Sequence, residues 1–522
     1  MNRRGFLRET LLALPAARAA SGESLNLEEA TLGDLARGFR DGRFTARAAT
    51  EWYLKRIQSL DKKGPTVNAV LEINPEAFGI ADALDRERRL RGARGPLHGV
   101  PVLIKDNLDT ADRMSTTAGS LALLGSSAAR DAFVVERLRS AGAVILAKTN
   151  LSEWANFRSP HSISGWSGRG GLTRNPYALD RNACGSSSGS AVAVSANFCA
   201  VAVGTETDGS VTAPASVNGI VGIKPTVGLV SRSGIIPISH SQDTAGPMAR
   251  TVRDAALLLN AMVGADPGDS ATRAAGNAAP DYTGFLDPRG LQGARLGVER
   301  KYFGANAAMD AVLEANLAEI KRQGAELVDP ANLPSHGQYD NEELEVLLYE
   351  FKADLNRYLA ERPKVRVRTL ADLIAFNRER RREEMPYFQQ ELFERAQAKG
   401  PLTDRAYVQA RALCRRLSQA EGIDAVIAKY KVQAIVAPTA GPAPLNDLVL
   451  GDPTWPGCTT PAAVAGYPHV TVPAGFVHGL PCGISFVGTA WSEPRLIALA
   501  YAFEQATRAR RAPTYPKTVN DW

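Results

Sequence analysis

Apolar residues follow two different patterns in the first third of the chain. Between residues 32 and 60 they recur at three- and four-residue spacing, which predicts two helices separated at Gly42. Continuous apolar runs follow at 100–104 and 143–147, with an amphipathic stretch at 132–140 between them. A strand that is buried on both faces is apolar throughout. These segments therefore predict a β–α–β unit of an α/β fold.

Residues 162–247 have an unusual composition of Gly, Ser, Ala, Thr and Val with few charges. Small residues let backbone segments approach closely, and glycine permits turns with positive φ. Apolar runs alternate with the glycines, so we expect core strands, turns and helices here rather than a flexible linker.

The pattern changes again after about residue 285. Helical spacing with many charges predicts helices at 308–323, 342–360 and 370–398. Strand-like apolar runs return at 434–437, 470–472 and 484–487. We expect an α/β protein with a single large core, in which helices flank a central mixed sheet and an α-helical insertion divides the core. The expected division is 28–285 for the first part of the core, 286–430 for a helical insertion on the substrate side, and 431–515 for the part that completes the core.

Composition excludes several classes of function. The 522 residues are 44% hydrophobic and 22% charged, as in an ordinary globular protein. A net charge of +6 is small for this length, so we expect no nucleic-acid partner. The five cysteines form no C-x-x-C pair and the six histidines form no H-x-x-x-H pair, so no metal site or cofactor is indicated.

The N-terminus has features of an export signal. Residues 2–8 contain the pair Arg3-Arg4 and resemble a twin-arginine motif, and a short apolar stretch follows at 11–20. Ala17-Arg18-Ala19 supplies the small residues of a cleavage site. We expect residues 1–20 to be a signal peptide that directs the protein to the periplasm, with no stable membrane association afterwards. An ordinary basic helix is the alternative.

Lys105 ends the apolar run that begins at residue 99. If that strand is buried, the ammonium group loses hydration, its pKa falls, and a neutral amine becomes available as a base. Two alternatives remain open: the side chain could extend past the strand end into water, or Asp106 could pair with it and keep it charged.

A serine-rich turn lies at Cys184-Gly185-Ser186-Ser187-Ser188-Gly189-Ser190, before a helix-compatible apolar run. Such a turn presents hydroxyls and backbone N–H groups together, which suits a proton relay or an anion site. An ordinary N-capping turn is the alternative.

A second turn, Thr207-Asp208-Gly209-Ser210, follows another apolar run. Gly209 permits an unusual backbone angle just before Ser210. The successive amides of Thr207, Asp208, Gly209 and Ser210 could converge on one point and form an oxyanion hole.

Taken together, the motifs resemble those of the amidase-signature family. G-V-P-V-L-I-K-D-N, G-S-S-S-G-S-A, T-D-G-S-V and G-I-K-P-T occur in the family's order, from about residue 32 to 247, and the likeness resumes at 435–442 and 465–488. The resemblance implies the amidase-signature fold and an amidase without cofactor or metal. It assigns Ser210 as the nucleophile, Ser186 as the bridging serine and Lys105 as the base, with an acyl-enzyme on Ser210.

The sequence departs from the usual family pattern at three positions. Thr212 replaces a basic residue, Asp208 replaces a glycine and Ser188 replaces another glycine. These variants are closer to bacterial peptide amidases, which deamidate C-terminal carboxamides. The expected partner is therefore a small-molecule or peptide amide substrate; no motif specifies the oligomeric state.

Three other hypotheses remain. Gly185-Ser186-Ser187-Ser188-Gly189 fits G-x-S-x-G, which would make Ser187 the nucleophile of an α/β-hydrolase with a downstream histidine. The amide-transferring component of a glutamine-dependent tRNA amidotransferase has the same signature, although an export signal argues against it. An inactive binding protein with this fold is the non-enzymatic alternative. Lys224 and Cys184 are interpreted as structural residues.

Overall fold

The computed structural model describes residues 25–362, 365–453 and 456–519. The expected signal peptide, residues 1–20, lies outside these ranges. None of the helices within them is both long and apolar enough to cross a lipid bilayer. All five cysteines are buried free thiols.

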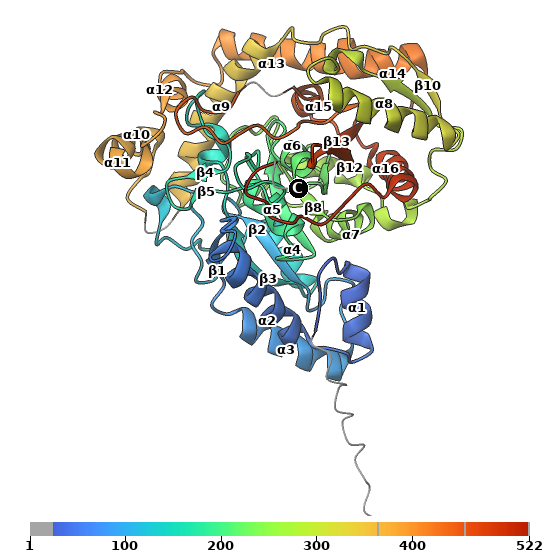
Figure 1. Cartoon of the computed structure of the whole chain (residues 1–522). Helices are drawn as coiled ribbons and strands as arrows, with labels where there is room; N and C mark the ends of the chain where they lie inside the picture. Colours follow the sequence, from blue (N-terminus) through green and yellow to red (C-terminus); the bar gives the residue numbers. More distant parts are fainter. Residues whose placement is uncertain (1–24, 363–364, 454–455, 520–522) are drawn as a thin grey trace, which may run out of the picture.

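The centre of the protein is a sheet of 11 strands with both parallel and antiparallel neighbours (Figure 1). Its strands, in spatial order, are β1 (Val70–Ile73), β3 (Val144–Thr149), β2 (Pro101–Lys105), β6 (Val201–Glu206), β8 (Thr244–Ala249), β7 (Val221–Lys224), β12 (His469–Val477), β13 (Leu480–Val487), β11 (Ala434–Pro438), β9 (Arg295–Val298) and β10 (Glu326–Val328). β2 runs parallel to both β3 and β6, whereas β8 is antiparallel to both of its neighbours, β6 and β7. The mixed sheet of the expected α/β fold is confirmed.

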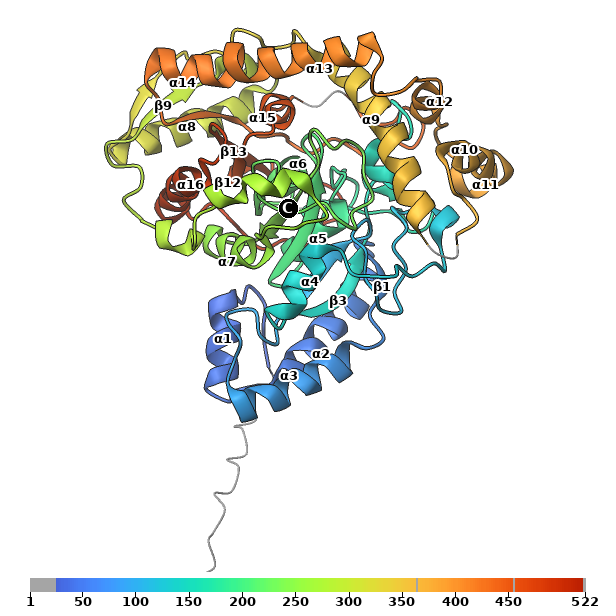
Figure 2. The same ribbon diagram turned by 180° about the vertical axis from the view of Figure 1, so that it is seen from behind.

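Helices cover the sheet on both faces. They are α1 (Leu32–Arg40), α2 (Ala46–Arg56), α3 (Ala77–Arg91), α4 (Phe133–Ser140), α5 (Ser188–Ser195), α6 (Thr212–Val217), α7 (Val252–Met262), α8 (Ala307–Arg322), α15 (Thr459–Ala465) and α16 (Glu493–Thr507). Seen from behind, α1–α3 lie together at one end of the molecule, and α7, α8 and α16 group beside β12 and β13 (Figure 2).

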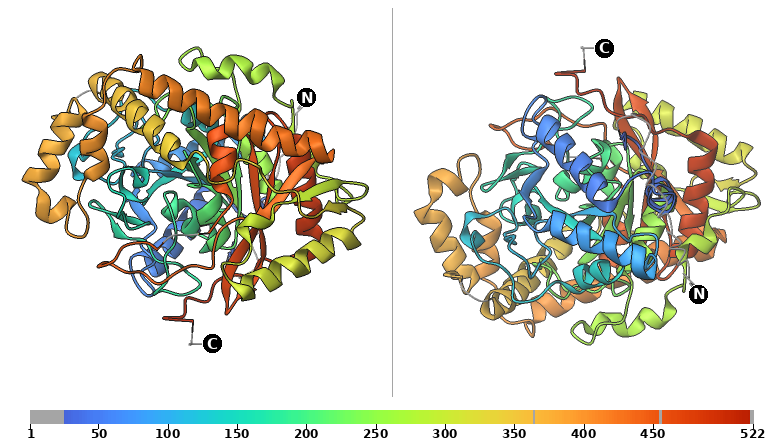
Figure 3. Two further views of the ribbon diagram at one scale, coloured as in Figure 1. Left: turned by 90° about the horizontal axis from the view of Figure 1, so that it is seen from above. Right: turned by 90° about the horizontal axis from the view of Figure 1, so that it is seen from below.

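Among the described residues, six further α-helices lie between β10 and β11 in the chain: α9 (Asp340–Glu361), α10 (Leu370–Glu379), α11 (Arg381–Glu384), α12 (Glu391–Gln397), α13 (Arg405–Ser418) and α14 (Asp424–Tyr430). Both views of Figure 3 place the gold and orange helices α10–α12 at one side of the molecule, away from α8 and α16. α9 packs on the core through Phe351, whose ring lies 5.0 Å from that of Phe157. This contact anchors the helical region beside the residues that follow β3.

Two local features differ from the sequence prediction. The pattern predicts a continuous helix over 370–398, but the stretch forms the three helices α10, α11 and α12, and the longest break lies between Glu384 and Glu391. Pro386 lies in this break, where it lacks the N–H that a helix needs. The expected helical region 286–430 also contains the strands β9 and β10, which pair with each other and, through β9, with β11.

The close packing of α5 accounts for small residues in the segment 162–247. All eight of its residues are buried, so the helix has no solvent-exposed face. A Cβ added to Gly189 would lie 2.3 Å from the carbonyl oxygen of Ala69 and 2.5 Å from that of Asn150. Only glycine allows the helix to pack this closely against the neighbouring backbone, and this packing places the serine-rich turn at the sheet edge.

Candidate active site

Three segments that carry the predicted site residues meet at one edge of the sheet. β2 and β6 are parallel neighbours, so Lys105 at the end of β2 and the turn after β6 lie at the same edge. The serine-rich turn joins them because the Ser187 amide donates a hydrogen bond to the Ser210 carbonyl at 3.1 Å. Residues separated by about 100 positions in the chain are therefore brought together by strand pairing.

Lys105 is fully buried and its amine has three neighbouring oxygens. Nζ lies 2.7 Å from Ser186 Oγ, 2.9 Å from Thr205 Oγ1 and 3.2 Å from the Thr205 carbonyl oxygen. Asn107 Nδ2 also donates to Thr205 Oγ1 at 2.9 Å, which fixes that hydroxyl. The lysine therefore does not reach solvent, and its tip is held against the serine-rich turn.

Burial lowers the pKa of Lys105 to about 7, although the carboxyl groups of Asp243 and Glu206 oppose the shift. Desolvation disfavours the ammonium form, so a large fraction of the amine is neutral near neutral pH. The alternative pairing with Asp106 does not form, because Asp106 Oδ2 instead lies 3.1 Å from Arg169 Nη1.

Ser186 and Ser210 are placed differently. Ser186 is buried, and its carbonyl accepts a hydrogen bond from the Ser152 amide at 3.1 Å. Ser210 is 8% exposed, and its hydroxyl forms no hydrogen bond within the described part of the chain. The Lys105–Ser186 contact of the predicted relay is therefore formed, and the Ser186–Ser210 hydroxyl contact is not. Hydrogen bonds of this type commonly tighten only when substrate binds.

The turn around Ser210 is held by a buried carboxylate that sequence analysis missed. Glu206 Oε2 accepts the amide of Val211 at 2.8 Å, and the amide and hydroxyl of Thr212 at 2.9 and 3.1 Å. Burial raises the pKa of Glu206, while these donors and Lys224 favour its ionised form. No sequence signal marked this role, because a carboxylate that binds nearby main-chain amides leaves no characteristic spacing.

The backbone of the turn also favours an anion site. Gly209 has φ +73°, and a Cβ there would lie 2.9 Å from Thr459 Oγ1, so glycine is required on both counts. Among the described residues, no acceptor binds the amides of Thr207, Asp208, Gly209 and Ser210. All four predicted oxyanion donors are therefore free of partners within the part of the chain that the structure describes.

Side chains from outside the turn bind Thr207 and Asp208. Thr207 Oγ1 donates to Asp243 Oδ1 at 2.6 Å, and Thr460 Oγ1 donates to Asp208 Oδ2 at 2.7 Å. Burial raises the pKa of Asp208 and of Glu343, and the Asp208 carboxyl reinforces the shift of Glu343. The turn thus lies beside a group of buried acidic side chains, which includes Asp243 and, from α9, Glu343.

A cavity of about 660 Å³ opens beside this site. It is lined by Asn107, Thr205 and Thr207 at one end, and by side chains including His240 and Asp354 farther away. Lys105, Ser186 and Ser210 are not among its lining residues. The cavity therefore reaches the residues that support the lysine and the turn, from the side of α9.

The competing nucleophile, Ser187, is occupied by main-chain hydrogen bonds. Its hydroxyl donates to the Thr205 carbonyl at 3.0 Å and accepts from the Thr205 amide at 3.2 Å. Within the described ranges no histidine bonds to it; His469 Nε2, for example, bonds Ser485 Oγ instead. Ser187 is therefore a structural residue that fixes α5 to β6.

The environments of Lys224 and Cys184 are consistent with the structural roles expected for them. Lys224 Nζ donates to the Pro225 carbonyl at 3.3 Å. Burial raises the pKa of the Cys184 thiol far above its ordinary value, so this cysteine carries no thiolate at neutral pH.

Comparison with known proteins shows which family this chain resembles. The Amidase family profile matches residues 48–497. A probable amidase of Arabidopsis thaliana is 44% identical over 510 residues, which cover 96% of this chain and 94% of that protein. The crystal structure of native peptide amidase from Stenotrophomonas maltophilia superposes with a TM-score of 0.89 at 52% identity, covering 94% of this chain and 99% of that one. A glutamyl-tRNA(Gln) amidotransferase chain of Pseudomonas syringae is 35% identical, with 92% of this chain and 98% of that one covered.

The fold, the motif order and these relatives lead to one conclusion: this chain belongs to the amidase family and is a hydrolase that acts on amide C–N bonds.

Proposed function

We propose that Ser210 is the nucleophile of this amidase and that Ser186 and Lys105 relay its proton. The observation that carries this proposal is the 2.7 Å contact between Lys105 Nζ and Ser186 Oγ in a buried setting. A neutral lysine amine has two N–H donors and one lone pair. Because the two oxygens of Thr205 can accept both N–H groups, the lone pair is free to accept the Ser186 hydroxyl proton.

The reaction then proceeds in two halves. Ser210 Oγ attacks the amide carbonyl while its proton passes to Ser186 and the Ser186 proton passes to Lys105. The amides of residues 207–210 stabilise the oxyanion. The C–N bond breaks as Lys105 returns a proton through Ser186 to the leaving nitrogen, and an acyl-enzyme remains on Ser210. Water attacks the ester by the same relay and releases the acid.

Peptides with a C-terminal carboxamide are the substrate class that we favour. The support is the 52% identity and near-complete coverage shared with peptide amidase structures, together with the variant turn Thr207-Asp208-Gly209-Ser210. The tRNA amidotransferase chains match at 35% identity or less, so they support the second candidate more weakly.

The substrate proposal predicts that the purified chain alone converts peptide carboxamides to peptide acids and releases ammonia. Mass spectrometry of a panel of peptide, aliphatic and aromatic amides measures this conversion. Hydrolysis of simple amides but not of peptide carboxamides would contradict the peptide proposal. A requirement for ATP and partner chains would favour the amidotransferase.

The nucleophile proposal predicts that Ser210→Ala lowers kcat by about 10⁴-fold or more, because the acyl-enzyme cannot form. The variant should also lose labelling by a serine-reactive phosphonate. Ser187→Ala is the matched control, since it removes a neighbouring buried hydroxyl. We expect the control to keep turnover within about tenfold of the parent protein, because it loses only one structural hydrogen-bonding group. Labelling at Ser187 would contradict the proposal.

The relay predicts a pH dependence with a defined direction. Lys105 must be neutral to accept a proton, so kcat/KM should rise with pH through an apparent pKa of about 7. Lys105→Met should lower kcat/KM by about 10²–10⁴-fold at every pH, because the base is lost. Circular dichroism would confirm that the variant is folded. A parent protein equally active at pH 5 and pH 9, or a fully active Lys105→Met, would contradict the relay.

We further propose export by the twin-arginine route, which the motif at residues 2–8 supports. In bacteria that have this pathway, the full-length chain should accumulate in the periplasmic fraction. Changing both Arg3 and Arg4 to Lys should retain it in the cytoplasm, while Arg8→Lys serves as the control outside the pair. Immunoblotting of cell fractions measures the outcome, and periplasmic accumulation of the double variant would contradict the proposal.

A further inference from the structure

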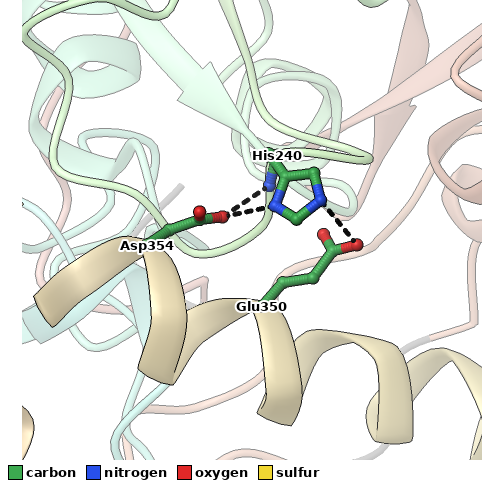
Figure 4. Close-up of side chains that lie close together, drawn as sticks. All are labelled: His240, Glu350 and Asp354. Atoms are coloured by element: carbon green, nitrogen blue, oxygen red, sulfur yellow. Dashed lines mark hydrogen bonds and ion pairs between the residues drawn. The ribbon is translucent and has the colours of Figure 1, made fainter. Parts of the chain in front are cut away.

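The segment 238–243 lies between the helical region and the nucleophile turn. On the α9 side it is bound by Glu343, Glu350 and Asp354, which occur at intervals of seven and four residues and so share one face of the helix. Figure 4 shows the two carboxylates of α9 that enclose the His240 ring.

His240 is bound at both ring nitrogens and at its amide. Nδ1 lies 2.7 Å from Asp354 Oδ2, and the backbone amide donates to the same oxygen at 3.1 Å. Nε2 lies 3.2 Å from Glu350 Oε1 (Figure 4). A neutral imidazole has one N–H, but here both nitrogens face carboxylate oxygens. Only the imidazolium, with two N–H groups, satisfies both carboxylates.

The two carboxylates also accept hydrogen bonds from other donors, with which a metal ion at these three residues would have to compete. Glu350 accepts the Ser241 amide at 3.0 Å and the Tyr407 hydroxyl at 2.7 Å, and Arg357 donates to the other oxygen of Asp354. A cation would have to displace these donors and one ring proton. The arrangement therefore favours a protonated histidine over a metal ligand.

The same segment is bonded directly to the nucleophile turn. Asp243 Oδ2 accepts the amides of Ile238 and Ser239 at 2.8 and 2.9 Å, and its other oxygen accepts the Thr207 hydroxyl at 2.6 Å. Gln242 Nε2 donates to the Thr207 carbonyl at 3.2 Å and to a carboxyl oxygen of α9 at 2.8 Å. The orientation of Thr207, a predicted oxyanion donor, thus depends on how the segment is held.

We propose that His240, as an imidazolium bridging Glu350 and Asp354, is a positioning residue that holds segment 238–243 against the nucleophile turn. It acts through Asp243 and Gln242, which fix Thr207, and it does not touch the reacting atoms. This inference rests on the proposed role of the turn as the oxyanion site.

Charged neighbours determine when the bridge is intact. Burial lowers the pKa of His240, and so does the positive charge of Arg411, which lies 3.9 Å from Glu350. The carboxylates of Asp354 and Glu350 outweigh both effects, so the pKa of His240 is raised. Arg232 binds the His240 carbonyl and is itself paired with Asp269. Because the folded-state pKa is above the unfolded value, the bridge is fully formed below the unfolded pKa. It is lost as pH rises through the folded pKa.

The test is the pH profile of kcat and KM for peptide-carboxamide hydrolysis. The parent protein should show a rising limb near pH 7 from Lys105 and a falling limb from His240, whose pKa is raised above that of an ordinary histidine. Glu350→Gln removes one charge that favours the imidazolium, so the falling limb should move down by about one pH unit while the rising limb stays. His240→Gln should lower kcat about tenfold with little change in KM, and it should lack this falling limb.

Glu345→Gln is the matched control, because it removes a carboxylate from the same helix that binds Lys399 rather than segment 238–243. Its pH profile should equal that of the parent protein, and thermal melts would confirm that all variants are folded. An unchanged falling limb in both Glu350→Gln and His240→Gln would overturn the proposal. Loss of activity with a chelator and recovery with Zn²⁺ would also overturn it, because a ring nitrogen of His240 would then coordinate a metal ion.

Failure of this inference is distinguishable from failure of the proposed function. If His240 has no positioning role, the parent protein still shows the Lys105 limb and still labels at Ser210. If the proposed function is wrong, that limb and that labelling are absent in the parent protein itself.

Discussion

The removal of one primary amine from water is the constraint on which the site depends. Lys105 ends a strand with parallel neighbours on both sides, beneath the serine-rich turn that begins α5, so its side chain cannot reach solvent. A buried ammonium is costly, and the amine is therefore biased towards its neutral form. Thr205 and Ser186 then provide the contacts that a neutral amine needs. The sheet topology thus accounts for the lowered pKa of this amine, on which its proposed role as a general base depends.

The small residues around this lysine serve the same purpose. Gly189 lets α5 approach the neighbouring backbone, and Gly204 faces the Ser187 side chain, where a Cβ would lie 2.8 Å from the hydroxyl oxygen. Larger residues would separate α5 from β6 and would admit water to the amine. The composition that made residues 162–247 conspicuous in the sequence is therefore a packing requirement of the region around the buried lysine.

Local sequence predicted those parts of the fold and site that depend on local pattern. The runs that end at Ile104 and Ala147 became β2 and β3, and Lys105 was recognisable because it directly follows an apolar run. The contact between Lys105 and the distant Ser186 was predicted only through the resemblance to a known family, and distant contacts outside its motifs were not predicted. His240 and Asp354 are 114 residues apart, and no periodicity links them. Glu206 directly precedes the turn at residues 207–210, yet its binding of main-chain amides became evident only from the coordinates.

The hydrogen bonds between α9 and segment 238–243 have a practical consequence for altering substrate preference. The helical region is expected to lie on the substrate side, and one face of α9 also binds the segment whose Asp243 and Gln242 contact Thr207. Under the proposed role of Thr207 as an oxyanion donor, substitutions chosen only for a new acyl group would disturb the rate of bond cleavage as well as affinity. Libraries that vary α9 should keep its inward-facing acidic residues fixed and diversify the remaining faces.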